Sequence, residues 1–329
     1  MRFKDAAPTP PPTAAELVLK GDKAFEKWDK FTPQGMLARI RPPALRPAQG
    51  SEPSGALFVN AWLFDGVDPK TWIPSIKKLG LNGVEIRATQ LFGDNMPALW
   101  SMLASQGLQI GAVHAGVDMT PFSFGSIASD LDSDRLPTLQ WLELTMELMR
   151  DAGIKRLVLY PGYKVYGDSS PYKSGQTLAS LNQLKTKAQS CGITIMVEIA
   201  QGQETYPQTG NLQGLIASVN SPWVKAGMNT ANTQLAEGKF STSLAGTLDY
   251  VHLSNYKPLP NGWKRSNYAP LTDGELPVAT LCAVLVDRQG TGRATCIYML
   301  NPNNPLGALG DFLTLKPKQD HSKTPHSTQ

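Results

Sequence analysis

The chain has 329 residues, of which 41% are apolar and 18% are charged, so it can bury a large core and is not a disordered protein. Its net charge is only +4 and its basic residues are scattered, which argues against a nucleic-acid-binding protein. No apolar run reaches the roughly 18 residues that a membrane-spanning helix needs. We therefore expect neither a nucleic-acid nor a membrane partner.

The first 54 residues differ from the rest because they are rich in proline. PTPPPT and RPPALRPAQGSEPSG cannot join a sheet, whereas AAELVLKGDKAFEKWDKF between them has the pattern of one amphipathic helix. We expect residues 1–54 to extend a later core. This N-terminus lacks the apolar stretch of a signal peptide, and Cys191, Cys282 and Cys296 lack CxxC spacing. Both features predict a cytoplasmic protein with free thiols.

Eight short, apolar and β-rich runs follow, each with the pattern of a buried strand. In chain order they are ALFVNAW (56–62), GVEIRA (83–88), LQIGAVHA (108–115), RLVLYPG (156–162), ITIMVEIA (193–200), VKAGMNTA (224–231), LDYVHLSN (248–255) and TCIYMLNP (295–302). Helix-period segments lie between them, such as residues 68–80, 95–107, 135–153 and 178–192, and each of these four ends at a glycine.

Strands that alternate with helices pair in parallel, and eight such units close a (β/α)8 TIM barrel. An open doubly wound sheet is the alternative, but NAWLFDGVDPKTW after the first strand contains neither GxGxxG nor GxxxxGK[ST]. We therefore predict an α/β protein with a TIM barrel over residues 55–313, a Pro-rich N-terminal extension, and a flexible polar tail over residues 314–329.

Active sites of such barrels lie at the carboxyl ends of the strands, which selects the polar residues to consider. The candidates for binding or catalysis are Trp62, Glu85, His114, Glu198, Asn229, Asn232, His252 and Lys257. Their donors and acceptors suit a polyhydroxylated small molecule. We expect Glu198 and His252 to meet in one solvent-accessible cavity.

Several segments resemble the sugar phosphate isomerase/epimerase family, the xylose isomerase-like TIM barrels. IPSIKKLGLNGVEI is similar to the family's passage into strand two, MELMRDAGIKRLVLYPG to strand four, AQSCGITIMVEIAQG to strand five and LDYVHLSNYK to strand seven. The resemblance covers roughly residues 57–301. It implies a divalent metal bound by Glu, Asp, His and Glu on strands five to eight, with the two glutamates moving a proton next to a carbonyl.

Carried over to this chain, the resemblance implies Glu198 and His252 as metal ligands on strands five and seven. The strand-six position is Asn229, with Asn232 where a His commonly follows, and the strand-eight position is Met299 or Leu300. Mn²⁺, Mg²⁺ and Zn²⁺ sites of this kind depend on charged ligands, so these departures predict a weak or absent metal site. They also remove one of the two proton-transfer carboxylates.

Each candidate also has a purely structural interpretation. Glu198 can be a carboxylate paired with a Lys or Arg, His252 and His114 can be hydrogen-bonded core histidines, and Glu85 can pair with Arg87. Lys257 can belong to a solvated basic loop, and Trp62 can be plain packing.

We predict an isomerase- or epimerase-like enzyme, or a lyase, that acts on a carbohydrate or other polyoxygenated molecule. Glu198 is its general acid or base, His252 orients it, and Asn229 and Lys257 stabilise the oxyanion. The alternative is a catalytically silent barrel that binds a sugar-like ligand or serves as a partner subunit. A DNA-repair endonuclease is disfavoured because only His114 and His252 lie within the barrel. A homo-oligomer remains open.

Overall fold

The computed structural model describes residues 56–64, 67–93, 95–116, 126–162, 174–199, 209–237, 248, 250–257, 267–269, 271–278 and 295–298. The chain divides into residues 1–41 and 42–329, and all described residues belong to the second unit. The predicted N-terminal extension and polar tail lie outside the described residues. The domain boundaries at residues 54 and 313 therefore stay predictions.

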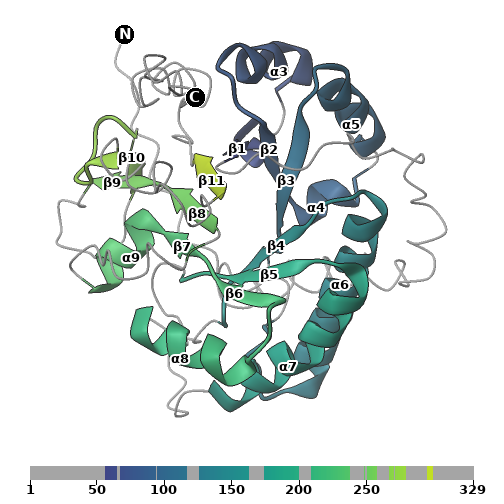
Figure 1. The fold of residues 1–329 in the computed structure, drawn as a ribbon, viewed down its shortest axis with the longest axis vertical. Coiled ribbons are helices and arrows are strands. Elements are labelled where there is room, and N and C mark those ends of the chain that lie inside the picture. Colours follow the sequence, from purple (N-terminus) through teal and green to yellow (C-terminus); the bar gives the residue numbers. More distant parts are fainter. Residues whose placement is uncertain are drawn as a thin grey trace, which may run out of the picture. The chain divides into compact units, whose positions relative to one another are not determined.

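The described unit is a parallel β-barrel with helices outside it (Figure 1). Its sheet has the order β6-β5-β4-β3-β2-β1-β11-β8-β7. The strands are β1 (Leu57–Asn60), β2 (Gly83–Arg87), β3 (Gln109–His114), β4 (Arg156–Leu159), β5 (Thr194–Val197), β6 (Val224–Ala226), β7 (Met228–Asn229), β8 (Tyr250–Leu253) and β11 (Thr295–Tyr298). Each falls within one of the runs predicted from the sequence, and the fold class is confirmed.

The ring closes through the predicted sixth strand, which is split at Gly227 into β6 and β7. β6 pairs with β5, and β7 pairs with β8. A Cβ at Gly227 would approach Tyr250, Glu198 and Met196 to 3.6–3.7 Å, an ordinary van der Waals distance, so this residue faces the barrel interior. The two ends of the paired sheet are thus successive pieces of one strand, and the barrel has eight strands as predicted.

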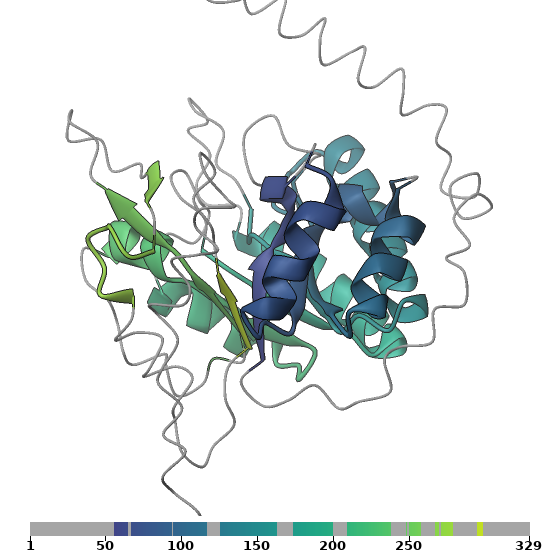
Figure 2. The same cartoon turned by 90° about the horizontal axis from the view of Figure 1, so that it is seen from above.

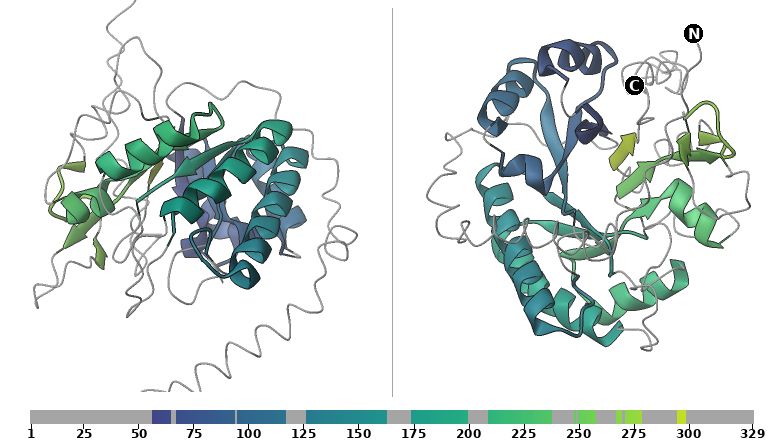
Figure 3. Two further views of the ribbon diagram at one scale, coloured as in Figure 1. Left: turned by 90° about the horizontal axis from the view of Figure 1, so that it is seen from below. Right: turned by 180° about the vertical axis from the view of Figure 1, so that it is seen from behind.

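The helices are η1 (Ala61–Phe64), α3 (Pro69–Lys78), α4 (Ala88–Leu91), α5 (Met96–Ser105), α6 (Asp132–Asp151), α7 (Ser174–Cys191), α8 (Thr209–Val219) and α9 (Thr230–Glu237). Helix α3 packs on α5 (Figure 2), and α7 packs on both α6 and α8 (Figure 3). None of the described helices is long and apolar enough to cross a bilayer.

Local sequence explains where the helices begin and end. The Asp68 side chain accepts a hydrogen bond from Lys70 N at the start of α3, and Pro69 occupies its first position. The glycines predicted to end four helices all have positive φ, namely Gly80, Gly107, Gly153 and Gly192.

Some predicted boundaries were wrong. Helices α6 and α7 begin earlier than residues 135 and 178, within polar stretches that carry no apolar period. The first and sixth runs were predicted to be strands to residues 62 and 231, but they turn into η1 after Asn60 and into α9 after Asn229. A short antiparallel pair, β9 (Asn255–Lys257) with β10 (Asn267–Ala269), follows strand β8.

Side chains alternate between the barrel interior and the helix layer. An apolar layer fills the interior, formed by Ala56, Phe58, Ala112, Val158, Met196 and Tyr250. Outward residues such as Val84, Leu157 and Ile195 are fully buried under the helices. Cys191 is a buried free thiol, while Cys282 and the side chain of Cys296 lie outside the description.

Candidate active site

A polar layer lies next to the apolar one, towards the carboxyl ends of the strands. Side chains of a strand face the barrel interior at every second residue. The interior positions two residues after Phe58, Ala112, Met196 and Tyr250 are therefore those of Asn60, His114, Glu198 and His252. Glu85 on β2 and Asn229 on β7 join them, and each of these polar residues is at most 1% exposed. The structure therefore gathers six polar side chains from six strands inside the barrel.

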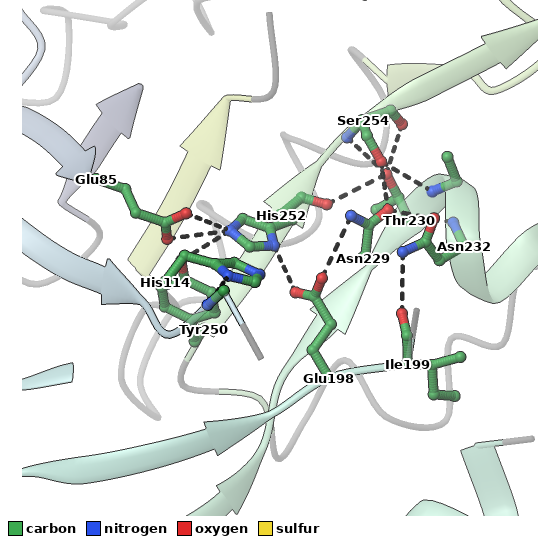
Figure 4. Close-up of polar contacts among 12 residues, drawn as sticks. Glu85, His114, Glu198, Ile199, Asn229, Thr230, Asn232, Tyr250, His252 and Ser254 are labelled. Atoms are coloured by element: carbon green, nitrogen blue, oxygen red, sulfur yellow. Dashed lines mark hydrogen bonds and ion pairs between the residues drawn. The ribbon is translucent and has the colours of Figure 1, made fainter. Parts of the chain in front are cut away.

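His252 lies between two carboxylates, Glu85 and Glu198 (Figure 4). Its Nε2 is 3.1 Å from both Glu85 oxygens and 2.8 Å from the Tyr250 hydroxyl oxygen. Its Nδ1 is 2.5 Å from Glu198 Oε2, a close ion pair in which the ring N–H does not point along the contact as it would in a hydrogen bond.

The two carboxylates set the charge of the imidazole. Burial by itself lowers the pKa of His252, but the negative charges of Glu198 and Glu85 outweigh burial and raise the pKa to about 10. His252 is therefore an imidazolium at neutral pH. Burial raises the pKa of Glu85, the His252 charge lowers it, and the Glu198 charge raises it, with a net increase. The imidazolium of His252 and the two carboxyl groups thus share one fully buried site.

Asn229 holds Glu198 from the other side. Its Oδ1 accepts hydrogen bonds from the Asn232 backbone N–H at 3.1 Å and the Ser254 hydroxyl at 2.5 Å. Since a backbone N–H can only donate, the amide oxygen must face it, and the amide NH₂ is directed to Glu198 Oε1 at 3.4 Å. Asn232 in turn donates from its side chain to the Ile199 carbonyl at 3.0 Å.

His114 and Trp62 form an aromatic part of the same site. The His114 ring is stacked on the His252 ring at 6.2 Å between centroids and meets the Trp62 and Tyr160 rings edge-on. Burial and then the positive charges of His252 and Arg87 lower the pKa of His114 well below its usual value. His114 is therefore neutral beside a charged neighbour.

The structure brings together seven of the eight predicted residues and places Lys257 apart from them. Lys257 lies on β9 with 53% of its side chain exposed and forms an ion pair with Asp273 at 2.6 Å. The predicted meeting of Glu198 and His252 is observed, but the prediction of a solvent-accessible cavity is not, because both side chains are 0% exposed. Their mutual neutralisation makes this burial tolerable. Glu85 contacts His252, and no Glu85–Arg87 pair forms.

Sequence reasoning missed two residues that contact this site. Tyr250 contacts His252 through its hydroxyl, and Ser254 donates to Asn229. The signal was available, because residues 250, 252 and 254 recur with the period of two that puts side chains on one face of a strand.

The implied metal ligands Glu198, His252 and Asn229 do not fit a divalent cation. Bonds of about 2.0–2.2 Å hold two ligand atoms of one metal roughly 3 Å apart, whereas His252 Nδ1 and Glu198 Oε2 are 2.5 Å apart. Asn229 presents amide hydrogens to the site because its oxygen already accepts two hydrogen bonds. In the part of the chain that the structure describes, no three His, Cys, Asp or Glu side chains are arranged to hold a metal ion.

The family model described as the xylose isomerase-like TIM barrel matches residues 73–311. No match was found among curated proteins.

Three solved structures illustrate the similarity of fold. The 3-keto-D-glucoside 4-epimerase YcjR from E. coli is 18% identical, with a TM-score of 0.61 over 78% of this chain and 97% of that chain. D-psicose 3-epimerase from Clostridium cellulolyticum H10, solved with D-tagatose, is 12% identical, with a TM-score of 0.60 over 79% and 96%. The IolI protein, solved with a zinc atom, is 14% identical, with a TM-score of 0.61 over 79% and 94%.

Proposed function

The chain belongs to the xylose isomerase-like TIM barrel family, and on that premise we propose that it is an enzyme of the isomerase or epimerase type, or a lyase, acting on a sugar-like or other polyoxygenated molecule. The observation that carries this proposal is the contact between Glu198 and His252, a buried carboxylate and a buried imidazolium 2.5 Å apart at the strand ends. Perturbed acid–base groups at this end of a barrel are typical of catalytic sites.

In this proposal Glu198 is the general base and then the general acid. It takes the proton from a carbon next to a carbonyl, which leaves an enediolate-like anion on the substrate. In an isomerisation it returns this proton to the former carbonyl carbon, while the hydroxyl proton of the first carbon passes to the former carbonyl oxygen. In an elimination it gives the proton to the hydroxyl group that leaves as water. One carboxylate is enough for this single-base route. The positive charge of His252 stabilises the substrate anion that forms in this transfer.

The neighbours of this pair have positioning roles. Glu85 and Tyr250 hold His252 through Nε2, and Asn229 donates to the Glu198 oxygen that does not face the imidazole. Asn229 is itself fixed by Asn232 and Ser254. These contacts restrict the orientation of the Glu198 carboxylate. Lys257 was predicted to stabilise the oxyanion, but its side chain is exposed and paired with Asp273, so it has no part in this proposal.

A weakly bound divalent metal has no part in this mechanism, because the residues at its expected position do not fit one. The imidazolium of His252 supplies the positive charge next to Glu198 instead. The sugar-like substrate is supported by the names of two similar structures, a 3-keto-D-glucoside 4-epimerase and a D-psicose 3-epimerase with D-tagatose.

A catalytically silent sugar-binding barrel is the second candidate. It is favoured by one observation, namely that Glu85 and Glu198 are both paired with His252 while each of the three side chains is 0% exposed. In such a protein the charge cluster would be a structural element of the barrel interior.

The test is solvent deuterium exchange into a panel of ketoses and aldoses, followed by NMR in D₂O. We expect exchange next to the carbonyl with the wild-type protein, without added metal and in the presence of EDTA. Glu198→Gln should lower the rate at least about 100-fold, as loss of a general base does. The control is Glu143→Gln on helix α6, where Glu143 accepts a hydrogen bond from the exposed side chain of Gln183.

The outcomes separate the two candidates. Exchange that is retained in Glu143→Gln and lost in Glu198→Gln supports the enzyme. Equal rates in Glu198→Gln and wild type would contradict the role of Glu198. Sugar binding without exchange by any substrate would support the silent barrel.

A further inference from the structure

Arg87 is a cation at the mouth of the barrel that the acid–base cluster does not use. It ends strand β2, two residues after Glu85 and therefore on the same face of the strand. Its guanidinium carbon lies 5.4 Å from the centre of the Trp62 ring, a cation–π contact that fixes the plane of the group. Among the described residues no carboxylate pairs with Arg87, since both oxygens of Glu85 face His252.

The Arg87 Nε–H is a donor without an acceptor. This atom is buried and has no hydrogen-bond partner within the described part of the chain. A buried donor left in this state has lost its hydrogen bonds to water without replacement, which is unfavourable. A protein retains such a cost where a ligand supplies the missing acceptor.

His114 offers a second donor of the same kind beside it. Arg87 and His114 are register partners on β2 and β3, so their side chains lie on the same face of the sheet. The His114 Nδ1 accepts a hydrogen bond from Gly116 N at 3.2 Å, which places the ring proton on Nε2. His114 is 1% exposed, and Nε2 has no hydrogen-bond partner among the described residues.

Trp62 connects these two donors into one surface. Its ring contacts the Arg87 guanidinium on its face and the His114 ring at 5.7 Å between centroids, edge to face. The three side chains come from three neighbouring segments, η1, β2 and β3, next to Glu85. Among the described residues, none supplies a negatively charged hydrogen-bond acceptor to these two donors.

We propose that Arg87 and His114, backed by Trp62, form a subsite for an anionic oxygen group of the substrate, a carboxylate or a phosphate. The proposal rests on the proposed function, because it narrows the polyoxygenated substrate to an acidic one such as a sugar acid or a sugar phosphate. The forked donors of Arg match the oxygens of either group, and the neutral His114 ring adds a hydrogen bond without a second charge. The anion would lie one interior position beyond Glu85, within reach of a molecule that also contacts Glu198.

Binding measurements on the full-length protein test the subsite. Isothermal titration calorimetry would compare D-gluconate, D-glucose 6-phosphate and D-glucose as carboxylate, phosphate and neutral probes of similar size. We expect at least one anionic probe to bind at least tenfold more tightly than D-glucose, and the tighter anion identifies the group. Arg87→Gln should remove this preference. Arg150→Gln is the matched control, since Arg150 pairs with Asp151 on the exposed end of α6.

A second variant keeps the test decisive if Arg87→Gln does not fold. Arg87→Lys retains the charge and loses the fork, so it should weaken the anionic probe at least threefold and leave D-glucose unchanged. The proposal is overturned if all three probes bind the wild type equally or not at all, or if Arg87→Gln and Arg87→Lys bind the anionic probe as tightly as the wild type does.

The proposed function fails separately. Glu198→Gln should retain the anion preference while losing proton exchange. If the wild type shows an Arg87-dependent preference but exchanges no proton in any substrate, the subsite stands and the enzymatic proposal falls. If neutral sugars are turned over and anionic probes do not bind more tightly, the enzymatic proposal stands and the subsite proposal falls.

Discussion

His252 is the residue on which the charge balance of the barrel interior depends. It contacts Glu85 through one ring nitrogen and Glu198 through the other, and all three side chains are fully buried. Removing the imidazole would leave two uncompensated carboxylates in a dry interior, which is the most costly kind of single substitution. The proton on this ring therefore contributes to stability as well as to the proposed chemistry.

The stability of the protein should fall as pH rises from about 6.5 to about 10. The pKa of His252 is raised from 6.5 to about 10 in the folded protein, so its contribution is fully present below 6.5 and is lost as pH rises through the folded value. Urea unfolding at several pH values measures this slope. His252→Gln should flatten it, and a wild-type stability that is constant or increases over this interval would contradict the charge assignment.

Asn229 is the residue that keeps the site from resembling a metal centre. Asn229→Asp would replace the NH₂ group that faces Glu198 by a carboxylate oxygen, while the other oxygen keeps its bonds to Asn232 and Ser254. We expect the variant to lose about 2 kcal/mol or more of stability without metal, because two carboxylates then approach each other in a buried site. We also expect it to gain binding of Mn²⁺.

Thermal unfolding with and without MnCl₂ checks this expectation. Mn²⁺ should raise the melting temperature of Asn229→Asp and leave that of the wild type unchanged. EDTA should also leave the melting temperature of the wild type unchanged. Asn182→Asp on helix α7 is the control, because its side-chain oxygen accepts only from Lys185. Stabilisation of the wild type by Mn²⁺ would show that the native site binds the metal after all.

The sequence was enough to predict which residues lie in this site, but not which of them contact one another. Glu198 and His252 follow buried strands, and the convergence of parallel strand ends is enough to predict that they meet. The contact between Glu85 and His252, 167 residues apart, depends on side-chain directions in the closed ring. The orientation of the Asn229 amide depends on one backbone N–H at Asn232, which no residue pattern reveals.

Among the elements, strand β3 shows how one residue sets the direction of a functional side chain. The register between β2 and β3 pairs Val84 with Ile110 and Glu85 with Ala112, so Gly111 is an extra residue in a β-bulge. A Cβ at Gly111 would lie 2.5 Å from the Phe58 ring. Glycine thus allows the bulge to lie against the Phe58 ring of the apolar layer. After the bulge, Arg87 and His114 are register partners.

Gly111→Ala should destabilise the protein by about 1–3 kcal/mol, because the Phe58 ring is buried on all sides and cannot move away from the new methyl group. Chemical unfolding gives the free energy. Gly214→Ala in the middle of α8 is the control and should stabilise by about 0.5–1 kcal/mol, since its Cβ meets no atom within 4 Å. Equal effects of the two substitutions would show that the close approach to Phe58 does not matter.

The existence and order of the elements were more predictable than their ends. All eight strands and four helices could be inferred from apolar periodicity and terminal glycines. The split at Gly227 and the start of α9 at Thr230 were not, because MNTA reads equally well as a strand. Tertiary contacts decide here, since the Thr230 hydroxyl donates to the Ser254 carbonyl at 2.6 Å and accepts from Ser254 N at 2.9 Å.

At the scale of the whole barrel, closure is what brings the candidate site together. Glu85 lies on the second strand and His252 on the seventh, and only β1 and β11 separate them in the ring. Family membership, fold class and the position of the site follow from the repeated strand–helix pattern. The residue types in the site do not follow from that pattern, and the clearest case is Asn229, which stands where the family resemblance implies an Asp.

The place of β11 between β1 and β8 has a consequence for biosynthesis. Residues 57–59 pair with residues 296–298, so β1 leaves the ribosome long before the strand that covers its outer edge. Until then β8 also lacks this neighbour, and His252 has no closed wall to hold it against Glu85. The wall that holds this charge cluster is therefore complete only after β11 has been synthesised.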